Sequence, residues 1–430
     1  MAQMPAWNLT SCREGVTLIQ GEAFPGKEAG STMKQQLIKA VGLDGRARDY
    51  IAYPKAVPPY PRSERIVGVK ADRFRYHCGE GDMWPLTWGA DGNIYAAAGD
   101  NKGSPMNFWR ISQYSSWNND GSGTANPAKL TNTNDWTIDL IDNLPVDPKI
   151  YCQNPAAPGI KPAGILDIDG TLYLAVEANS YGDRPLFNRQ HNYHGWIITS
   201  ADCGKTWNRE ATPTDFFTGR LSSCHFLQFG RGYQGARDGY VYAYFPVDED
   251  GESYWENADG LLLGRVPKER ILERGAWEFC ASPDGTAWSR EEQDARPVFS
   301  YYKMTGSDHV CYNPGLGCYL LGNYSFVDPQ LHPRPIHQLS WPEAYRSQLT
   351  LFEAPEPWGP WSLFYQDDDW GTYGDYQPVF PTKWISPDGR CLFMVSSGSW
   401  DDYNFVVQKL ALKLAGDADF PPESRYFTYR

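Results

Sequence analysis

Basic residues, histidines and long apolar runs are all scarce in this chain, and the scarcity excludes several classes of function. Lys and Arg number 39 against 52 Asp and Glu among 430 residues, and the net charge is −13. Binding to nucleic acid or to an anionic membrane surface depends on neutralising phosphate groups, so we expect neither partner. Since no segment approaches about 18 consecutive apolar residues, the sequence predicts no membrane insertion.

Cysteine is present without a recognisable pattern. The nine cysteines are an odd number and include no CxxC pair, so a zinc site is not supported. The first residues also lack the apolar core of a signal peptide. Because the composition is typical of exported proteins, we expect a secreted or periplasmic protein whose leader has been removed.

Aromatic residues, in contrast, are abundant. The chain contains 17 Trp, 27 Tyr and 19 Phe, together with 41 Gly and 33 Pro. Aromatic side chains favour strands, whereas Gly and Pro favour turns, so many short strands are expected. Aromatic rings also stack on the apolar faces of sugars, although most such rings in a protein pack in its core.

A hairpin pattern recurs along the chain. Residues 81–101, GDMWPLTWGADGNIYAAAGDN, form a predicted β-hairpin that turns at Asp91-Gly92. Related hairpins cover residues 162–178, 224–246, 308–324 and 377–398. Their turn glycines, Gly92, Gly170, Gly239, Gly317 and Gly389, are 78, 69, 78 and 72 residues apart. A self-similar unit of this length is the pattern of a propeller blade.

The later part of each unit supplies outer strands. These are expected at residues 107–116, 195–207, 260–271, 348–365 and 403–413. We therefore predict an all-β, five-bladed β-propeller that forms a single domain at residues 73–430. Residues 1–72 would complete the last blade or cover one face, and residues 267–277 would hold a short helix. A pair of β-sandwiches is the alternative, although sandwiches need no regular repeat.

One motif supports the propeller. Residues 200–207, SADCGKTW, match the Asp-box (S-x-D-x-G-x-T-W) of sialidase-like propellers, and residues 282–288, SPDGTAW, are a looser match. The expected role is a turn in which Asp202 accepts backbone N–H groups and Trp207 packs between strands.

In a propeller the first strand of each blade begins, and the second ends, at the mouth of a central funnel. The side chains expected there are Asp82, Asp100, Lys161, Glu177, Ser223, His225, Asp308, His309, Asn323, Tyr376, Gln377 and Ser397. Clustered carboxyls cannot all ionise freely, so at least one pKa should be raised. A protonated carboxyl beside an ionised one is what glycoside hydrolysis uses. Bound Ca²⁺ is the alternative explanation of such a cluster.

Four stretches carry a resemblance to a known family. They are residues 81–100, residues 260–271 (GLLLGRVPKERI), and residues 358–366 (WGPWSLFYQ) with 381–398 (PTKWISPDGRCLFMVSSG). Over residues 78–412 the chain resembles the endo-D-arabinanase family of five-bladed propeller glycoside hydrolases, formerly a domain of unknown function.

The resemblance implies cleavage of D-arabinofuranosyl linkages in arabinogalactan and lipoarabinomannan by aspartates in the funnel. Asp82 and Asp100 match the first family pair, and Asp308 fits a third position. Our hypothesis is that Asp82 and Asp308 are the catalytic pair and that Asp100 tunes Asp82. No cofactor is expected to be required, although a structural Ca²⁺ is possible.

The expected partner is a polysaccharide or oligosaccharide. The predicted sugar contacts in the funnel are Trp84, Trp88, Glu177, His225, His309, Tyr312, Asn323, Trp370 and Tyr376, with Tyr181, Tyr324, Tyr373 and Trp400 as further candidates.

Three other functions stay open. A polysaccharide lyase would use His225, His309 or Tyr312 as its base, although an acidic funnel would repel a uronic-acid polymer. A non-catalytic carbohydrate-binding propeller would bind without turnover. A sialidase would need three arginines, and the predicted inner-strand starts contain none.

Overall fold

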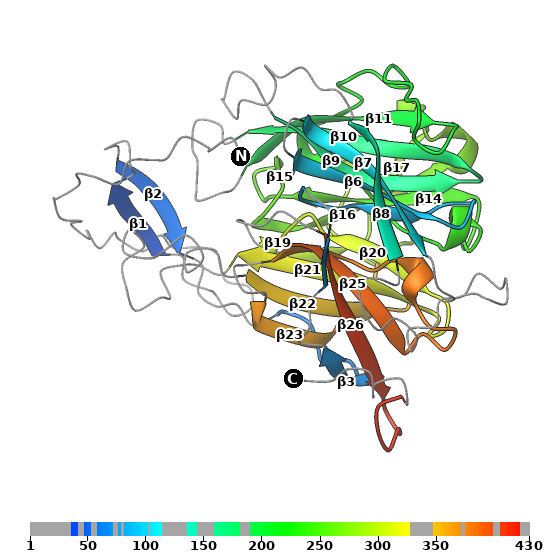
Figure 1. Ribbon diagram of the computed structural model, residues 1–430. Coiled ribbons are helices and arrows are strands. Elements are labelled where there is room, and N and C mark those ends of the chain that lie inside the picture. Colours follow the sequence, from blue (N-terminus) through cyan, green and yellow to red (C-terminus); the bar gives the residue numbers. More distant parts are fainter. Residues whose placement is uncertain are drawn as a thin grey trace, which may run out of the picture. The chain divides into compact units, whose positions relative to one another are not determined.

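The computed structural model describes twelve segments of the chain (Figure 1). They are residues 36–41, 47–52, 58–71, 76–78, 81–101, 104–113, 136–143, 159–180, 190–326, 347–370, 375–398 and 405–421. The chain forms two compact units, Met1–Pro54 and Lys55–Arg430. In the first, β1 (Gln36–Val41) and β2 (Ala47–Ala52) form an antiparallel hairpin.

The second unit is an all-β, five-bladed β-propeller, as predicted, and the β-sandwich alternative is wrong. Each of its five sheets begins with one of the hairpins expected from the sequence (Figure 1). The predicted inner and outer strands fall on these sheets because apolar and aromatic residues recur between the Gly-rich turns.

The blades follow one another along the chain. Blade one contains β5 (Leu86–Trp88), β6 (Ile94–Asn101), β7 (Ser104–Gln113) and β8 (Trp136–Asn143). Blade two contains β9 (Gly159–Ile168), β10 (Thr171–Ser180), β11 (His191–Ser200) and β12 (Phe217–Thr218), and β15 (Ser253–Tyr254) also pairs with β11. Blade three contains β13 (His225–Phe226), β14 (Tyr240–Val247), β16 (Ala258–Pro267), β17 (Glu278–Cys280) and β18 (Trp288–Ser289), and β19 (Phe299–Thr305) pairs with β16.

The last two blades close the ring. Blade four contains β20 (His309–Asn313), β21 (Cys318–Phe326), β22 (Ser347–Ala354) and β23 (Ser362–Trp370). Blade five contains β24 (Tyr376–Val379), β25 (Cys391–Ser397), β26 (Phe405–Leu414) and β3 (Ile66–Ala71), and β4 (Tyr76–Cys78) also pairs with β26. Part of the segment 1–72 thus supplies an outer strand of the last blade.

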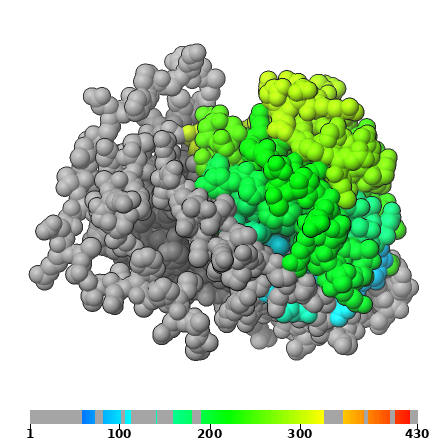
Figure 2. Space-filling model, turned by 90° about the horizontal axis from the view of Figure 1, so that it is seen from above, coloured from blue at the N-terminus to red at the C-terminus, as the bar shows by residue number. Residues whose placement is uncertain are grey.

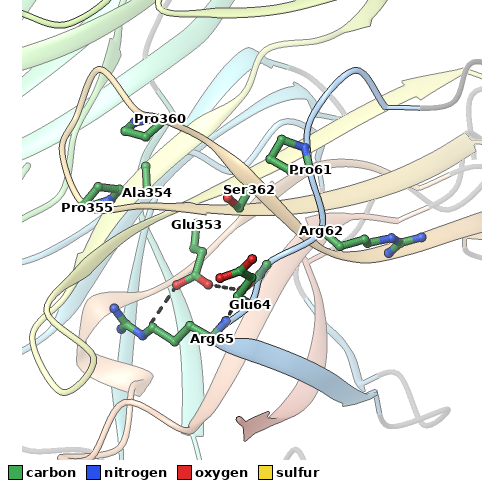
Figure 3. Close-up of a pocket in the computed structure, with 10 residues that line it drawn as sticks. Pro61, Arg62, Glu64, Arg65, Glu353, Ala354, Pro355, Pro360 and Ser362 are labelled. Carbon is green, nitrogen blue, oxygen red and sulfur yellow. Dashed lines mark hydrogen bonds and ion pairs between the residues drawn. The ribbon is translucent and has the colours of Figure 1, made fainter.

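Two further contacts hold blade five in place. Trp84 of blade one packs edge-on against Phe405 of blade five, with ring centroids 5.1 Å apart. The strand that precedes β3 lies along blade four, where the Ser63 amide donates to the Leu363 carbonyl at 2.8 Å. A cavity of about 310 Å³ lies beside this strand (Figure 3). Glu353, which lines this cavity, pairs with Ser63 and Arg65. These pairs connect blade four to the segment that leads into β3 of blade five.

The predicted helix at 267–277 is wrong in type. Residues in this range form two 3₁₀ turns, η6 (Lys268–Arg270) and η7 (Arg274–Ala276). The buried Trp277 ring donates its Nε1–H to the carbonyl of Ile271 at 3.1 Å and so fixes the segment as a compact loop. An α-helix of this length would be marginal in any case, because helix nucleation is unfavourable.

Both Asp-box motifs form the expected turn. Asp202 accepts hydrogen bonds from the Thr206 amide at 2.9 Å and the Thr206 hydroxyl at 2.6 Å. Asp284 likewise accepts from the Thr286 hydroxyl at 2.7 Å. In each turn the Trp ring donates its Nε1–H to the carbonyl of the motif glycine. These bonds give Asp202 and Asp284 a structural role.

Candidate active site at the mouth of the propeller

The Asp82 side chain of blade one contacts Lys161 of blade two and Tyr376 of blade five. The backbone of Asp82 pairs with Gly99, so Asp82 and Asp100 lie at the same end of the first hairpin, as the sequence predicts. The Nζ atom of Lys161 lies 3.4 Å from Asp82 Oδ2 and 2.6 Å from Asp100 Oδ2. The Tyr376 hydroxyl donates a hydrogen bond to Asp82 Oδ2 at 3.1 Å. A buried carboxylate is thereby held between a cation and a phenol.

Blades two, three and four are joined by a second group of polar side chains. Glu177 lies opposite Lys161 in the sheet and accepts a hydrogen bond from Asn179 Nδ2 at 3.3 Å. On the neighbouring blade, Ser223 Oγ lies 2.7 Å from His225 Nε2. The His225 ring packs against the His309 ring with centroids 5.0 Å apart.

Tyr324 connects this second group of side chains to Tyr376 and Asp82. The Tyr324 phenol interacts electrostatically with three carboxyls, those of Glu256, Asp308 and Glu177. Its ring centroid is 6.3 Å from that of Tyr376, which returns the chain of contacts to Asp82. We call the resulting set the mouth ring. Its members are Asp82, Asp100, Lys161, Glu177, Ser223, His225, Asp308, His309, Tyr324 and Tyr376.

The carboxyls of the mouth ring have raised pKa values. Burial raises the pKa of Asp82 to about 6; Lys161 opposes the rise and Asp100 adds to it. Burial raises the pKa of Glu177 to about 7, against the influence of Ser223, Lys161 and Asn179. The pKa of Asp308 is raised well above its ordinary value, again by burial. At neutral pH the ring therefore holds carboxyls in different protonation states.

The two histidines of the ring are neutral at ordinary pH. Burial lowers the pKa of His309 to about 3. Burial and the neighbouring His309 also hold the pKa of His225 well below its usual range. These rings can therefore donate or accept a hydrogen bond, but they contribute no positive charge.

Several buried polar atoms at the mouth have no hydrogen-bond partner of normal geometry among the described residues. They are Glu177 Oε2, both oxygens of Asp308, His225 Nδ1, His309 Nε2, the side-chain amide of Gln377 and Ser397 Oγ. An unpartnered buried polar atom is unfavourable, and native proteins leave few of them. A ligand rich in hydroxyl groups would satisfy them.

The backbone at the mouth is strained at several places. Positive φ angles occur at Met83 (75°), Trp84 (51°), Asp100 (46°) and Gln377 (51°), all next to or within the ring. Side chains other than glycine rarely adopt this region, and such strain clusters at functional sites.

Some predicted site residues join the ring and others do not. Asp82, Asp100, Glu177, His225, Asp308, His309 and Tyr376 belong to it. Trp84 is fully buried, donates to the Gly81 carbonyl at 3.0 Å and packs on Trp109 and Phe405, so it offers no face to a sugar. Trp370 is also buried in the core of blades four and five.

Three more predicted contacts do not belong to the mouth ring. Trp88 pairs with Ile94 next to the turn of the first hairpin, whereas Asp82 pairs with Gly99 at the other end of that hairpin. Tyr312 lies near the far end of β20, where it pairs with Tyr319. Asn323 donates to the Met304 carbonyl at 3.0 Å and to Thr350 at 2.7 Å, which fixes it within the blade. Tyr181, Tyr373 and Trp400 lie outside the described residues.

Two residues near the ring were not predicted. Glu256 is fully buried and interacts electrostatically with Tyr324, and the centroid of the Trp255 ring lies 5.9 Å from that of the Tyr376 ring. Both follow β15, in the connection between β14 and β16 of blade three. The repeat could not place them, and a Trp-Glu pair in a loop is too common to be a signal.

No three His, Cys, Asp or Glu side chains gather in the geometry of a metal site within the part of the chain that the structure describes. A structural Ca²⁺ therefore stays a prediction. None of the helices among the described residues has the length and apolar character needed to cross a bilayer.

No protein-family model and no curated protein sequence matches the chain. Solved structures do resemble it. A protein from Bacteroides ovatus that is provisionally assigned as a hydrolase is 12% identical, with a TM-score of 0.45 over 78% of this chain and 87% of the other. A GH43_1 enzyme from Xanthomonas citri is 12% identical, with a TM-score of 0.39 over 85% and 93%. Its complex with xylose is 13% identical, with a TM-score of 0.37 over 85% and 91%. Similarity at this level carries no argument about function.

Proposed function

We propose that this propeller is a glycoside hydrolase and that the mouth ring cleaves the glycosidic bond. The observation that carries the proposal is that two buried carboxyls, Asp82 and Glu177, have raised pKa values near neutrality and are both under the electrostatic influence of Lys161, which is ion-paired with Asp82 and lies opposite Glu177 in the sheet. Glycoside hydrolysis needs one ionised and one protonated carboxyl on either side of the bond.

Asp82 suits the role of the ionised carboxylate. Lys161 and Tyr376 both stabilise its negative charge, and Asp100 holds the Lys161 ammonium in place. In this role Asp82 would activate water or attack the anomeric carbon directly.

Glu177 suits the role of the proton donor better than Asp308 does. A catalytic acid works best when its pKa lies near the operating pH, and the pKa of Glu177 is about 7. Glu177 Oε2 has no partner of normal geometry among the described residues, so a proton on it would be available to the leaving oxygen of a bound sugar. Asp308, with its much higher pKa, would stay protonated and donate a hydrogen bond to a sugar hydroxyl.

D-arabinan is the substrate we propose to test first, and its choice rests on the family resemblance of the sequence. Several carboxyls against a single lysine favour a neutral glycan over a uronic-acid polymer. The lyase alternative is further weakened because a base with a pKa of about 3, such as His309, removes protons poorly at neutral pH. Export, which would bring the protein to such a polymer, belongs to the same proposal.

The test is a digest of D-arabinan, L-arabinan and a uronan by the wild type and by Asp82→Asn, Glu177→Gln and Asp308→Asn. Asp82→Asn and Glu177→Gln should each lose about 10²–10⁴-fold in turnover. The matched control is Asp169→Asn, an exposed aspartate in the turn at the far end of blade two. Hydrolysis of D-arabinan that survives both ring substitutions would contradict the assignment, and binding without turnover would indicate a carbohydrate-binding propeller.

A second substrate separates the two roles. An aryl glycoside with a good leaving group needs little protonation, so Glu177→Gln should keep most of its activity on it, whereas Asp82→Asn should not. If Asp308→Asn rather than Glu177→Gln shows this selective rescue, Asp308 is the donor.

A further inference from the structure

A second cavity lies in blade three, away from the mouth ring. It has a volume of about 470 Å³ and is lined by Pro59, Arg220, Val247, Asp248, Glu249, Asp259, Gly260, Pro297, Ser300 and Tyr302. We call it the blade-three cavity. Pockets for small ligands are of this size. Blades two and three supply most of the described surface that is visible in the space-filling view (Figure 2).

Strand register places the blade-three cavity at the same end of the propeller as the ring. His225 of β13 pairs with Tyr244 of β14, and Val247 follows three residues later in the same direction. Val247 in turn pairs with Gly260 of β16, and Gly260 pairs with Ser300 of β19. Since neighbouring strands are about 4.8 Å apart, the cavity lies roughly 10–15 Å outward from the inner strand.

One loop connects the two sites. Residues 248–257 begin with Asp248 and Glu249, which line the blade-three cavity. The same loop ends with Trp255, which packs on Tyr376, and Glu256, which interacts electrostatically with Tyr324. The loop therefore connects the wall of the cavity to side chains packed against the mouth ring.

Lys303 holds two carboxylates of the cavity, those of Asp248 and Asp259, in place. Lys303 is buried and pairs with Asp248, and its Nζ lies 3.1 Å from Asp259 Oδ2. Lys303 holds a strained backbone conformation, with φ at 55°. A buried lysine in such a conformation keeps both carboxylates in one orientation and spares a ligand the entropy of ordering them.

Arg220 lines the same cavity, and not all of its donors are used. Its two terminal nitrogens donate to the carbonyls of Glu292 and Ala295, at 3.4 Å and 3.5 Å. Its Nε is buried and has no partner among the described residues. A buried donor left in this way indicates a missing acceptor.

We propose that the blade-three cavity is a secondary subsite that binds a neutral sugar unit of the same glycan chain whose bond is cleaved at the mouth ring. Carboxylates and a guanidinium bind paired hydroxyl groups, while the Tyr302 ring and the prolines offer apolar surface to the C–H face of a sugar. Three carboxylates against Arg220 and Lys303 disfavour an anionic unit. The inference rests on the proposed function and deepens it, because it specifies a substrate several units long.

The test blocks the cavity without touching the ring. Ser300 is exposed on β19, where its backbone pairs with Gly260 and its N–H donates to Tyr60 Oη at 2.7 Å. Ser300→Trp fills the cavity and keeps this bond. The matched control is Glu269→Trp, which places the same ring on an exposed turn at the opposite end of the blade. Thermal unfolding of both variants verifies that they fold.

Ser300→Trp should lower kcat/KM on long D-arabinan about tenfold, the effect of losing one well-placed contact, and leave a short fragment unaffected. Equal effects on long and short substrates, or none on either, would overturn the subsite.

If the wild type hydrolyses no polymer, the proposed function fails and binding decides the subsite separately. The probes are octasaccharides of D-arabinan, L-arabinan, xylan and mannan, followed by saturation-transfer NMR. Weaker binding by Ser300→Trp than by the wild type supports the subsite. Equal binding by both proteins, or no binding of any probe, refutes it.

Discussion

Lys161 is the side chain on which the chemistry of the mouth ring depends most. It lies within ion-pair distance of Asp82 and Asp100 and also lowers the pKa of Glu177. Without its charge the buried Asp82 would ionise only at higher pH, and the proposed base would be protonated at neutrality. Lys161 is therefore proposed to set the pH range of the enzyme.

Lys161→Met should shift the acid side of the pH–kcat/KM profile upward. Activity requires ionised Asp82 and falls as pH drops through its pKa, about 6 in the wild type. Removing the cation raises that pKa further, because Lys161 opposes the effect of burial. The measurement is the profile from pH 4 to pH 9, with Lys161→Arg, which keeps the charge, as the control. An unchanged acid side in Lys161→Met would contradict the role given to Lys161.

Glu177 links pH to stability. Burial raises its pKa from 4.5 to about 7 in the folded protein, so the folded state holds a proton that the unfolded state has lost between these values. Stability should therefore fall as pH rises from about 4.5 to 7, by on the order of 3 kcal/mol for this group at most.

Glu177→Gln should remove this loss and leave the protein more stable than the wild type at pH 8, although inactive. Urea unfolding at pH 5 and pH 8 measures both effects, and Glu269→Gln, at an exposed site, is the control. A Glu177→Gln protein whose stability changes between pH 5 and pH 8 by the same amount as that of the wild type, or one that is less stable than the wild type at pH 8, would refute the prediction.

At the scale of elements, the Asp-box turns act as joints between blades. Gly204 has a φ of 82°, and a Cβ there would lie 1.9 Å from a ring atom of Phe108 in blade one. Gly285 has a φ of 70°, and a Cβ there would lie 2.2 Å from Trp358, in the loop between β22 and β23 of blade four. Each motif glycine is needed both for the turn and for the aromatic ring of another blade.

Gly204→Ala should destabilise the propeller by about 2–4 kcal/mol, because backbone strain and a clash with Phe108 add together. The control is Gly170→Ala in the turn of blade two. Its φ is 93°, but nothing lies within 4 Å of the added Cβ, so only the strain remains. Urea unfolding compares the two. Equal losses would show that the contact with Phe108 contributes nothing.

At the scale of the whole molecule, the ring of blades is closed by non-covalent contacts between distant parts of the chain. β3 pairs with β26, and the aromatic rings of blades one and five interlock at Phe405, which also approaches Trp384 at 6.5 Å. The mouth ring needs this closure, because Asp82 comes from blade one and Tyr376 from blade five.

Phe405→Ala should lower the free energy of unfolding by about 3–5 kcal/mol, the usual loss for a buried phenylalanine. Because the cavity opens between blades one and five, it should also loosen the contact of Tyr376 with Asp82 and reduce kcat. Val67→Ala, at a half-exposed position of β3, is the control and should change little. A Phe405→Ala protein with wild-type stability would contradict this account of ring closure.

Much of the fold could be predicted because the repeat is local. The turn at Asp91-Gly92 and its counterparts define two inner strands per blade, and geometry then brings Asp82, Glu177, His225 and Asp308 to one face. The same reasoning failed for rings such as Trp84 and Tyr312. Whether an aromatic side chain lies in the funnel, in the core or at the far end of a strand depends on residues of the neighbouring blades. The sequence of a single repeat contains no information about those residues.

The sequence by itself determined the number of blades, the strands of each and the end at which the carboxyls gather, since turn residues and alternating apolar residues act over a few positions. Only the tertiary structure decided which of these carboxyls are buried together and that Lys161 lies between two of them. It also decided that Glu256 is buried near the mouth ring and that blade three contains a cavity. Burial and charge pairing are set by side chains from blades far apart in the chain, so they arise only when the ring has closed.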